Sequence, residues 1–155
     1  SSPAPSLTPP ADDEPTQIFP RLFISSLSTA ESSSIICAHR ITHILTIHRL
    51  APPILSTSHP IERMHLPLTD TPFTDLLCHL PSTTQWIHDS LTSSPDSRVL
   101  VHCEMGISRS TSVVVGYIMW ARGCAVDEAV GMVKEKRAVA RPNEGFLTQL
   151  GEWRE

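Results

Sequence analysis

One cysteine and one arginine in this chain stand at a spacing that suits reaction with a phosphate group. Five residues separate Cys103 from Arg109, with the short β-branched run 99–101 before them and a long apolar stretch after them. These flanks are typical of a buried strand and a buried helix, so residues 103–109 should form the loop between them. The backbone N–H groups of such a loop converge on one point, where the positive end of the helix dipole adds to them. The sequence therefore predicts an anion site with a sulfur nucleophile at its floor.

The side chains of this loop suit different parts of that chemistry. Cys103 would face N–H groups at a helix start, which favours a nucleophilic thiolate near neutral pH. The planar guanidinium of Arg109 can hold two oxygens of a tetrahedral dianion. Gly106 would allow the positive φ angle that a tight loop needs. We expect His102 to orient the loop rather than carry protons, because its side chain leaves the strand on the face away from Cys103.

The residues around this loop resemble the cysteine-dependent protein tyrosine phosphatases. His102-Cys103, five further positions and Arg109-Ser110 match the signature loop of that family, and the whole run 101–110 is similar to its dual-specificity branch. The likeness extends to segments that resemble the family's first strand, its next strand and its last helix start: 20–24, 41–45 and 141–146. The cysteine–arginine spacing alone would be weak evidence for this resemblance, because it occurs by chance in many chains. The loop, the strand before it, the helix after it and the matching flanks together are specific to the family.

Strands that alternate with helical patterns indicate an α/β domain, with the ligand at the carboxyl ends of the strands. The resemblance implies a central, mostly parallel sheet flanked by helices, in the dual-specificity form of the protein tyrosine phosphatase fold. At 155 residues the chain is long enough for one such domain, which we place at residues 17–155. Residues 1–16 hold five prolines and few large apolar side chains, so we expect a disordered tail, with a docking or regulatory motif as the alternative.

The resemblance also implies a two-step reaction that requires no metal and no other cofactor. Cys103 attacks phosphorus, a carboxylic acid protonates the leaving oxygen, and water then hydrolyses the phosphocysteine. Ser110 could donate a hydrogen bond to the sulfur and so help it leave in the second step. The phosphoryl oxygens would be held by the Arg109 guanidinium and by the backbone N–H groups of the loop residues Glu104, Met105, Gly106, Ile107, Ser108 and Arg109.

Asp70 is the predicted general acid. In the dual-specificity branch the acid follows a strand about thirty residues before the nucleophile, where a mobile loop can carry it over the pocket. Asp70 lies 33 residues before Cys103, in a turn-rich stretch after the predicted strand 61–66. The alternative is that Asp70, or Asp75 five residues later, only caps the following helix. We predict Asp70 as the acid and Asp75 as the cap or hinge partner.

Three further residues belong to the predicted site or its rim. Asn143 is a good N-cap for the last helix and should support the site. Arg141 precedes it in the segment that the family brings near the pocket rim, where it could hold a second phosphate or an acidic side chain of the substrate. Cys78 follows the acid loop and could trap oxidised Cys103 as a disulfide, although we favour the interpretation that Cys78 is a small core residue.

The composition excludes several classes of partner. The net charge is −4 with only two lysines, so we expect no nucleic-acid surface, and no apolar run is long enough for membrane insertion. Four scattered cysteines without a Cys-x2-Cys pair favour reduced thiols in the cytoplasm or nucleus over zinc binding. The spacing of His39, His43 and His48 does not place them on one face of a strand, so we do not expect a metal site there. We expect a monomer that acts on a phosphoprotein.

The substrate class follows in part from the single tyrosine. Tyr117 lies inside the apolar helix, so no tyrosine is available to line the deep cleft that the tyrosine-selective branch of the family uses. We therefore predict a shallow pocket that admits phosphotyrosine, phosphothreonine and phosphoserine. The alternatives are a non-protein substrate, such as a phosphoinositide, RNA or glucan, and a catalytically silent phosphate-binding scaffold.

Local patterns predict the remaining elements. A hairpin or edge strand is expected at 18–24, and Ser28 to Glu31 has the form of a capping box that starts a helix over 29–38. The other expected elements are strands at 41–47 and 61–66, a helical run at 74–92 that Pro81 should kink or restart, and helices at 108–123, 126–137 and from Asn143.

Overall fold

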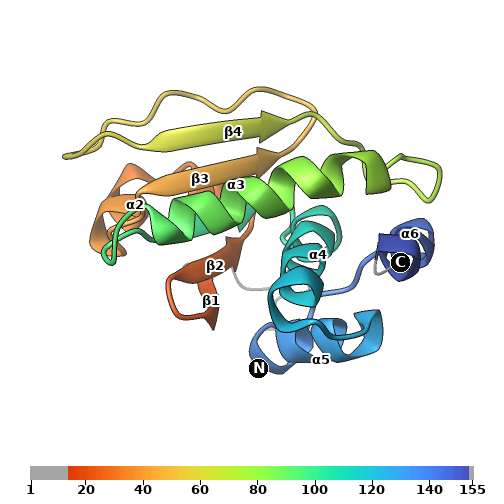
Figure 1. Ribbon diagram of the computed structural model, residues 1–155. Helices are drawn as coiled ribbons and strands as arrows, with labels where there is room; N and C mark the ends of the chain where they lie inside the picture. The colour runs from red at the N-terminus through yellow and green to blue at the C-terminus, as the bar shows by residue number, and fades with distance from the viewer. Residues whose placement is uncertain (1–13, 154–155) are drawn as a thin grey trace, which may run out of the picture.

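A computed structural model of the chain describes residues 14–153 and contains one five-stranded sheet. The strands are β1 (Thr16–Phe19), β2 (Leu22–Ser25), β3 (His43–Ile47), β4 (Glu62–Leu66) and β5 (Val99–His102). Their order across the sheet is β1-β2-β5-β3-β4, and every neighbouring pair is parallel except β1 with β2, which form an antiparallel hairpin. The mostly parallel α/β sheet expected from the sequence is confirmed (Figure 1).

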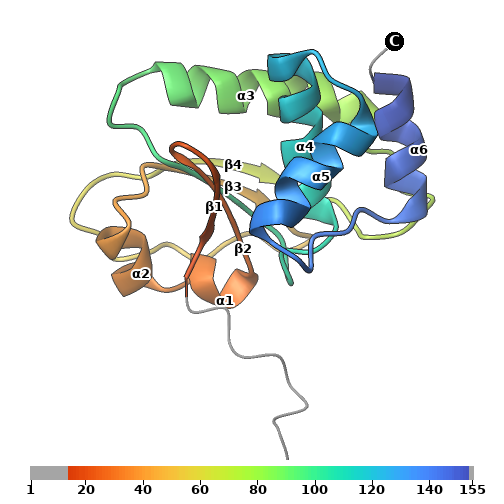
Figure 2. The same ribbon diagram turned by 90° about the horizontal axis from the view of Figure 1, so that it is seen from below.

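Helices cover both faces of this sheet. Two short helices lie on one side, and the four longer ones lie on the other (Figure 2). The short helices are α1 (Leu27–Ala30) and α2 (Ser33–Ala38). The longer helices are α3 (Leu80–Thr92), α4 (Arg109–Arg122), α5 (Val126–Lys136) and α6 (Glu144–Trp153), and a 3₁₀ turn, η1 (Leu77–His79), precedes α3.

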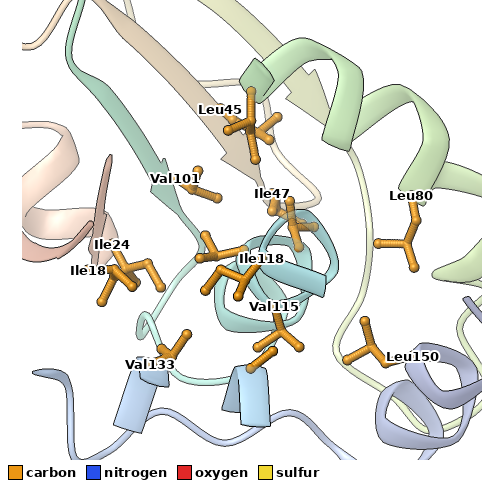
Figure 3. Close-up of a cluster of buried hydrophobic side chains, with 14 of the residues drawn as sticks. Ile18, Ile24, Leu45, Ile47, Leu80, Val101, Val115, Ile118, Val133 and Leu150 are labelled. Carbon is orange, nitrogen blue, oxygen red and sulfur yellow. The ribbon is translucent and has the colours of Figure 1, made fainter. Parts of the chain in front are cut away.

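The strand sequences explain why both faces are covered. Successive side chains of a strand point to opposite faces, so a strand buried on both sides is apolar at consecutive positions. In β5, Leu100 packs in the cluster beneath α1 and α2, whereas its neighbours Val99 and Val101 pack in the larger core. Figure 3 shows that this larger core gathers Val101 and Ile24 of the sheet with Ile118 of α4. The helix that follows β5 therefore lies at the centre of the fold.

The prediction of a single helix over residues 29–38 is wrong. Two short helices occupy this stretch, separated at Glu31 and Ser32. The hydroxyl of Ser32, not that of Ser28, accepts a hydrogen bond from a helical N–H, the Ile35 N–H at 3.4 Å. A run of serines offers several competing caps, and the capping-box pattern alone does not say which one starts a helix.

The helical run predicted over 74–92 begins later than expected. The α-helix starts at Leu80, with Pro81 in its first turn, where proline loses no intrahelical hydrogen bond. Gly123 ends α4 in the left-handed conformation with φ 62°, as predicted.

The predicted tail, residues 1–16, lies almost entirely outside the described residues. Of its last residues Pro15 is buried and Thr16 already belongs to β1, and the domain boundary at residue 17 stays a prediction. No helix within residues 14–153 has the length and apolar character needed to cross a membrane.

Candidate active site

The loop from β5 to α4 lies at the carboxyl end of the sheet and encloses Cys103. This cysteine follows β5 directly and is 2% exposed, with its sulfur 3.2 Å from the Ser110 hydroxyl oxygen. Gly106 has φ 68°, and a Cβ placed there would lie 2.8 Å from the Ser25 carbonyl oxygen. Only glycine fits both the conformation and this close approach to β2. The tight loop predicted between strand and helix is therefore present.

Arg109 occupies the first turn of α4 and folds back over the loop. Its Nη1 donates a hydrogen bond to the Leu68 carbonyl oxygen at 3.0 Å, and its Nη2 lies 3.8 Å from a carboxylate oxygen of Glu104. Leu68 stands two residues before Asp70. The guanidinium thus lies between the cysteine loop and the stretch that carries the predicted acid.

Asp70 is exposed, and Asn143 connects it to the rest of the site. The Asn143 side-chain amide donates to a carboxylate oxygen of Asp70 at 2.9 Å, while its own Oδ1 accepts the Phe146 N–H at 2.9 Å and so caps α6 as predicted. The backbone N–H of Asn143 donates to the Ser108 hydroxyl at 3.0 Å. One residue therefore contacts the acid loop, the cysteine loop and the start of α6.

Asp75 has the capping role predicted for it. Its carboxylate accepts the Cys78 N–H at 3.1 Å and so caps η1. This backbone hydrogen bond, together with one from the Cys78 side chain, lowers the pKa of Asp75. Of the two aspartates, only Asp70 makes a hydrogen bond with a residue that also contacts the cysteine loop.

The acid loop rests on α6 through contacts that the sequence did not reveal. Gln149 accepts the N–H groups of Leu76 and Leu77 at 2.7 and 2.8 Å, and its amide donates to the Thr74 carbonyl at 2.9 Å. Gly145 lies against the Pro72 carbonyl so closely that there is no space for a Cβ. A glutamine in an amphipathic helix looks like an ordinary surface residue, so no sequence signal pointed to this role.

His102 lies beneath the loop and is buried. Its ring shares a hydrogen bond with the Thr46 hydroxyl at 2.8 Å and another, at 3.2 Å, with the Cys103 carbonyl oxygen. Burial lowers the pKa of His102 to about 4, so the imidazole is neutral at neutral pH. These contacts fit the predicted orienting role.

Arg137 is a second residue that the sequence did not reveal. It is buried, and it donates to the carbonyl oxygens of Gly106 at 2.8 Å and Met105 at 3.3 Å and to the Thr16 hydroxyl at 2.8 Å. In the sequence it continues the charged run 134–137, which is typical of a solvated helix end. The structure instead places its guanidinium against the back of the cysteine loop.

Two predicted rim residues have different surroundings. The backbone N–H of Arg141 donates to the Ile107 carbonyl at 2.7 Å, so this exposed arginine lies beside the loop. Cys78 is exposed on η1, and the interpretation that it is a core residue is wrong. Among the described residues its thiol has no hydrogen bond to the cysteine loop, and a disulfide with Cys103 stays a prediction.

Comparison with known proteins decides the family. The model of the dual specificity phosphatase catalytic domain matches residues 22–155. The chain belongs to this family. It is 32% identical over 138 residues to mouse dual specificity protein phosphatase 15, covering 89% of this chain and 57% of the mouse protein. Mouse dual specificity protein phosphatase 22 is also 32% identical, over 89% of this chain and 72% of that protein.

Solved structures agree with this assignment. The crystal structure of DUSP15 superimposes with a TM-score of 0.85 at 30% identity, covering 92% of this chain and 88% of that one. The expected family and fold are thereby confirmed. Because the chain spans little more than half the length of phosphatase 15, the match describes a catalytic domain and not the whole of a relative.

Proposed function

We propose that this domain hydrolyses phosphate monoesters on tyrosine, serine and threonine side chains of proteins through a phosphocysteine intermediate. The observation that carries the proposal is that the loop with the buried sulfur and the guanidinium is linked by hydrogen bonds to the segment that carries the Asp70 carboxylate. Cys103 and Arg109 belong to the loop from β5 to the first turn of α4 and Asp70 to the segment after β4, and hydrogen bonds through Leu68, Ser108 and Asn143 join the two segments. A module that only bound phosphate would need no carboxylate at the rim.

In the first step the Cys103 thiolate attacks phosphorus and the bond to the leaving oxygen breaks. Asp70 supplies the proton that this oxygen needs. The loop N–H groups and the Arg109 fork hold the phosphoryl oxygens as charge moves onto them. When phosphate arrives, its oxygens take the place of the Glu104 carboxylate and the Leu68 carbonyl as partners of Arg109.

In the second step water attacks the phosphocysteine and the sulfur leaves as thiolate. Asp70, now ionised, takes the proton from water. The Ser110 hydroxyl, 3.2 Å from the sulfur, stabilises the departing thiolate with a hydrogen bond. His102 remains neutral and holds the Cys103 carbonyl, so it takes no part in proton transfer.

Phosphoproteins are the substrate class that the surroundings of the loop favour. Polyanions such as RNA would need several cations, whereas the exposed residues at this loop include the acidic Glu104 next to Cys103 as well as Arg141. We also propose a reducing compartment, the cytoplasm or the nucleus, because Cys37, Cys78, Cys103 and Cys124 are all unpaired.

The test is turnover of a small aryl phosphate and of matched phosphotyrosine, phosphothreonine and phosphoserine peptides. Cys103→Ser should abolish turnover of all four, whereas Ser110→Ala should slow the second step and let phosphoenzyme accumulate. Activity that survives Cys103→Ser would refute the mechanism.

A catalytically silent phosphate-binding scaffold is the second candidate. The crystal structure of human tyrosine phosphatase-like serine/threonine/tyrosine-interacting protein, 32% identical over 90% of this chain with a TM-score of 0.81, shows that the fold also occurs in a protein named for interaction. Saturable binding of a phosphopeptide without any turnover by the unmodified chain would favour this candidate.

A further inference from the structure

A second basic site lies at the opposite end of the sheet from Cys103. A hollow of about 720 Å³ is lined there by residues of the turns that enter the parallel strands, among them Arg21, Arg40 and Arg98. These arginines precede β2, β3 and β5, whereas Cys103 follows the carboxyl end of β5. The length of β5 puts Arg98 about 16 Å from Cys103. The hollow is therefore separate from the catalytic loop.

The charges in this hollow are unbalanced. Asp96 is the one carboxylate among its lining residues, and no ion pair within residues 14–153 involves any of the three arginines. Arg40 is exposed and makes no side-chain hydrogen bond in the described part of the chain. This concentration of positive charge stands out because the chain as a whole carries a net charge of −4.

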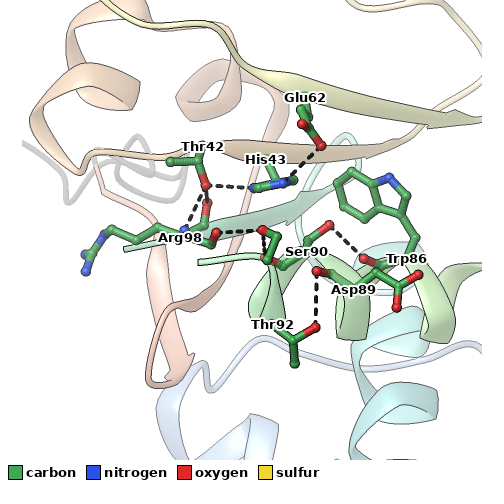
Figure 4. Close-up of polar contacts among 10 residues, drawn as sticks. Thr42, His43, Glu62, Trp86, Asp89, Ser90, Thr92 and Arg98 are labelled. Atoms are coloured by element: carbon green, nitrogen blue, oxygen red, sulfur yellow. Dashed lines mark hydrogen bonds and ion pairs between the residues drawn. The ribbon is translucent and has the colours of Figure 1, made fainter. Parts of the chain in front are cut away.

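The guanidinium of Arg98 is held in place while much of it stays available. Its Nε donates to the His39 carbonyl at 2.6 Å, and its Cζ lies 4.8 Å from the centre of the Phe23 ring. Figure 4 shows its terminal nitrogens extended away from the contacts of Thr42 and His43. No residue in the range 14–153 accepts a hydrogen bond from its Nη atoms. A guanidinium fixed by a ring and a carbonyl is pre-organised to receive an oxyanion.

The backbone of two of these arginines is left-handed, with a local cause in each case. Arg21 and Arg40, with φ 68° and 55°, are the two non-glycine residues with positive φ in the described residues, and both line this hollow. The left-handed region favours glycine or asparagine, because the Cβ of other residues crowds the backbone there. Nη1 of Arg21 donates hydrogen bonds to the carbonyl oxygens of Leu91, Ser94 and Ser97. These contacts account for an arginine at position 21.

Arg40 ends α2 in a Schellman motif, in which its N–H donates to the Cys37 carbonyl and the Ile41 N–H donates to the Ile36 carbonyl, both at 3.1 Å, and this motif accounts for its positive φ. The backbone is therefore bonded, whereas the Arg40 guanidinium has no hydrogen-bond partner among the described residues.

We propose that this hollow is a second phosphate-binding site, in which Arg40 and Arg98 hold the oxygens of a phosphate group. Guanidinium forks match phosphate oxygens in geometry, and a phosphorylated residue carries nearly two negative charges at neutral pH. The phosphate can come from a phosphorylated side chain of a bound protein or from inorganic phosphate. The site does not depend on the phosphatase reaction, because it uses none of the catalytic residues.

The test uses protein whose catalytic cysteine has been blocked with iodoacetate, so that the loop does not contribute. Inorganic phosphate, a phosphoserine peptide and its unphosphorylated counterpart are titrated separately while NMR follows the Arg98 Nε–H and the Arg40 backbone N–H. We expect both signals to shift and saturate with the two phosphate-bearing probes and to stay unchanged with the unphosphorylated peptide. Tighter binding of the peptide than of inorganic phosphate assigns a phosphoprotein as the source, and equal binding assigns the free anion.

Arg40→Gly is the informative variant, because glycine suits the left-handed backbone and only the cation is lost. It should weaken phosphate binding about tenfold, the loss expected for one charge-assisted hydrogen bond. Lys134→Gln, an exposed cation on α5 outside the hollow, should change nothing. Absence of a saturable shift up to about 10 mM phosphate, a range that covers millimolar dissociation constants, would overturn the proposal. Equal affinity of Arg40→Gly and the unmodified chain would also overturn it.

Discussion

The environment of a thiol decides both its reactivity and its access to reagents, and the four cysteines of this domain differ in both. Cys103 is 2% exposed but opens onto the predicted anion site, whereas Cys124 is buried in the core. Cys78 is exposed, but partial desolvation by its neighbours and a hydrogen bond with Asp75 raise its pKa. The most exposed thiol is therefore not the one expected to react first.

Iodoacetate at about pH 6 should accordingly alkylate Cys103 before the other cysteines, because only the thiolate reacts and the loop attracts the anionic reagent. Mass spectrometry of the labelled peptides measures the order, and vanadate should protect Cys103 alone. Faster labelling of Cys78, or equal labelling of all four, would contradict the assignment of the nucleophile.

Asp70→Asn should lower kcat for phosphate esters with poor leaving groups by about 100-fold and have little effect on activated aryl esters, because only the former need a proton. The pH–rate profile should also lose its alkaline limb. Asp75→Asn is the matched control, since it removes the η1 cap but leaves the dependence on the leaving group unchanged. If Asp75→Asn gives the larger effect, the two roles are reversed.

His102 should couple stability to pH. Its folded-state pKa of about 4 lies below the ordinary value of 6.5, so between these values the unfolded chain binds more protons than the folded chain. The stability present above pH 6.5 is therefore lost as pH falls toward 4, by up to about 1.4 kcal/mol per pH unit. Urea unfolding at several pH values measures the slope, and His102→Gln should flatten it. An NMR titration of the imidazole with a midpoint near 6.5 would contradict the burial argument.

At the scale of elements, α6 and the residue before it position the acid loop. Asn143 contacts Asp70, Gly145 lies against the Pro72 carbonyl, and Gln149 bonds three backbone groups of residues 74–77. A loop that must bring a carboxylate over the pocket is thus held from one side by a helix and from the other by Arg109 at Leu68.

Gly145→Ala should push the acid loop away from α6, because an added Cβ would meet backbone atoms of Pro72 that have little freedom to move. We expect a loss of about 1–3 kcal/mol in the free energy of unfolding and a selective fall in kcat for poor leaving groups. Labelling of Cys103 by iodoacetate should be unchanged.

Gly151→Ala is the matched control for that substitution. This glycine lies in the same helix with no atom within 4 Å of an added Cβ, so alanine should be neutral or slightly stabilising. Unfolding curves and leaving-group series on both variants separate the clash from a general effect of alanine. Identical behaviour of the two variants would show that α6 does not position the loop.

The elements also show which features the sequence could predict. The inner strands β3 and β5 and the helix after Cys103 were predictable because apolar runs and Gly123 mark them locally. The cysteine loop was predictable because its motif is specific. The two-helix form of residues 27–38 was not, since the six serines of residues 25–34 offer competing caps. The contacts of Gln149 and Arg137 were not predictable either, because each depends on segments far apart in the chain. These polar side chains find their partners only in the folded chain, so the local sequence pattern does not indicate them.

At the scale of the whole molecule, the two ends of the parallel sheet carry different groups. The carboxyl end holds the cysteine loop and the acid loop, and the amino end holds the arginines of the second hollow. Strands buried on both faces separate the two ends, so ligands at one end do not contact the other. Substitutions at Arg40 and Arg98 should therefore leave the hydrolysis of small aryl phosphates unchanged.

Arg137 connects three distant parts of the chain: β1 through Thr16, the cysteine loop through Gly106 and Met105, and the end of α5. Arg137→Met would keep much of the side-chain volume but leave the buried Gly106 carbonyl oxygen and the part-buried Met105 carbonyl oxygen without these donors. We expect a loss of about 3 kcal/mol in the free energy of unfolding. We also expect a lower kcat and slower alkylation of Cys103, because the loop loses the contacts that fix its shape.

Thr16→Val separates these effects, since it removes one hydrogen bond of Arg137 at the half-buried β1 end and leaves both loop carbonyls bonded. It should cost about 1 kcal/mol and leave kcat unchanged. Arg137→Lys should recover part of the stability but not the loop geometry, because an ammonium group lacks the planar fork that reaches both carbonyls. Urea unfolding, kcat and the alkylation rate are measured on all three variants. If Arg137→Met loses stability while kcat and the alkylation rate stay at the unmodified values, Arg137 contributes only to folding and does not position the loop.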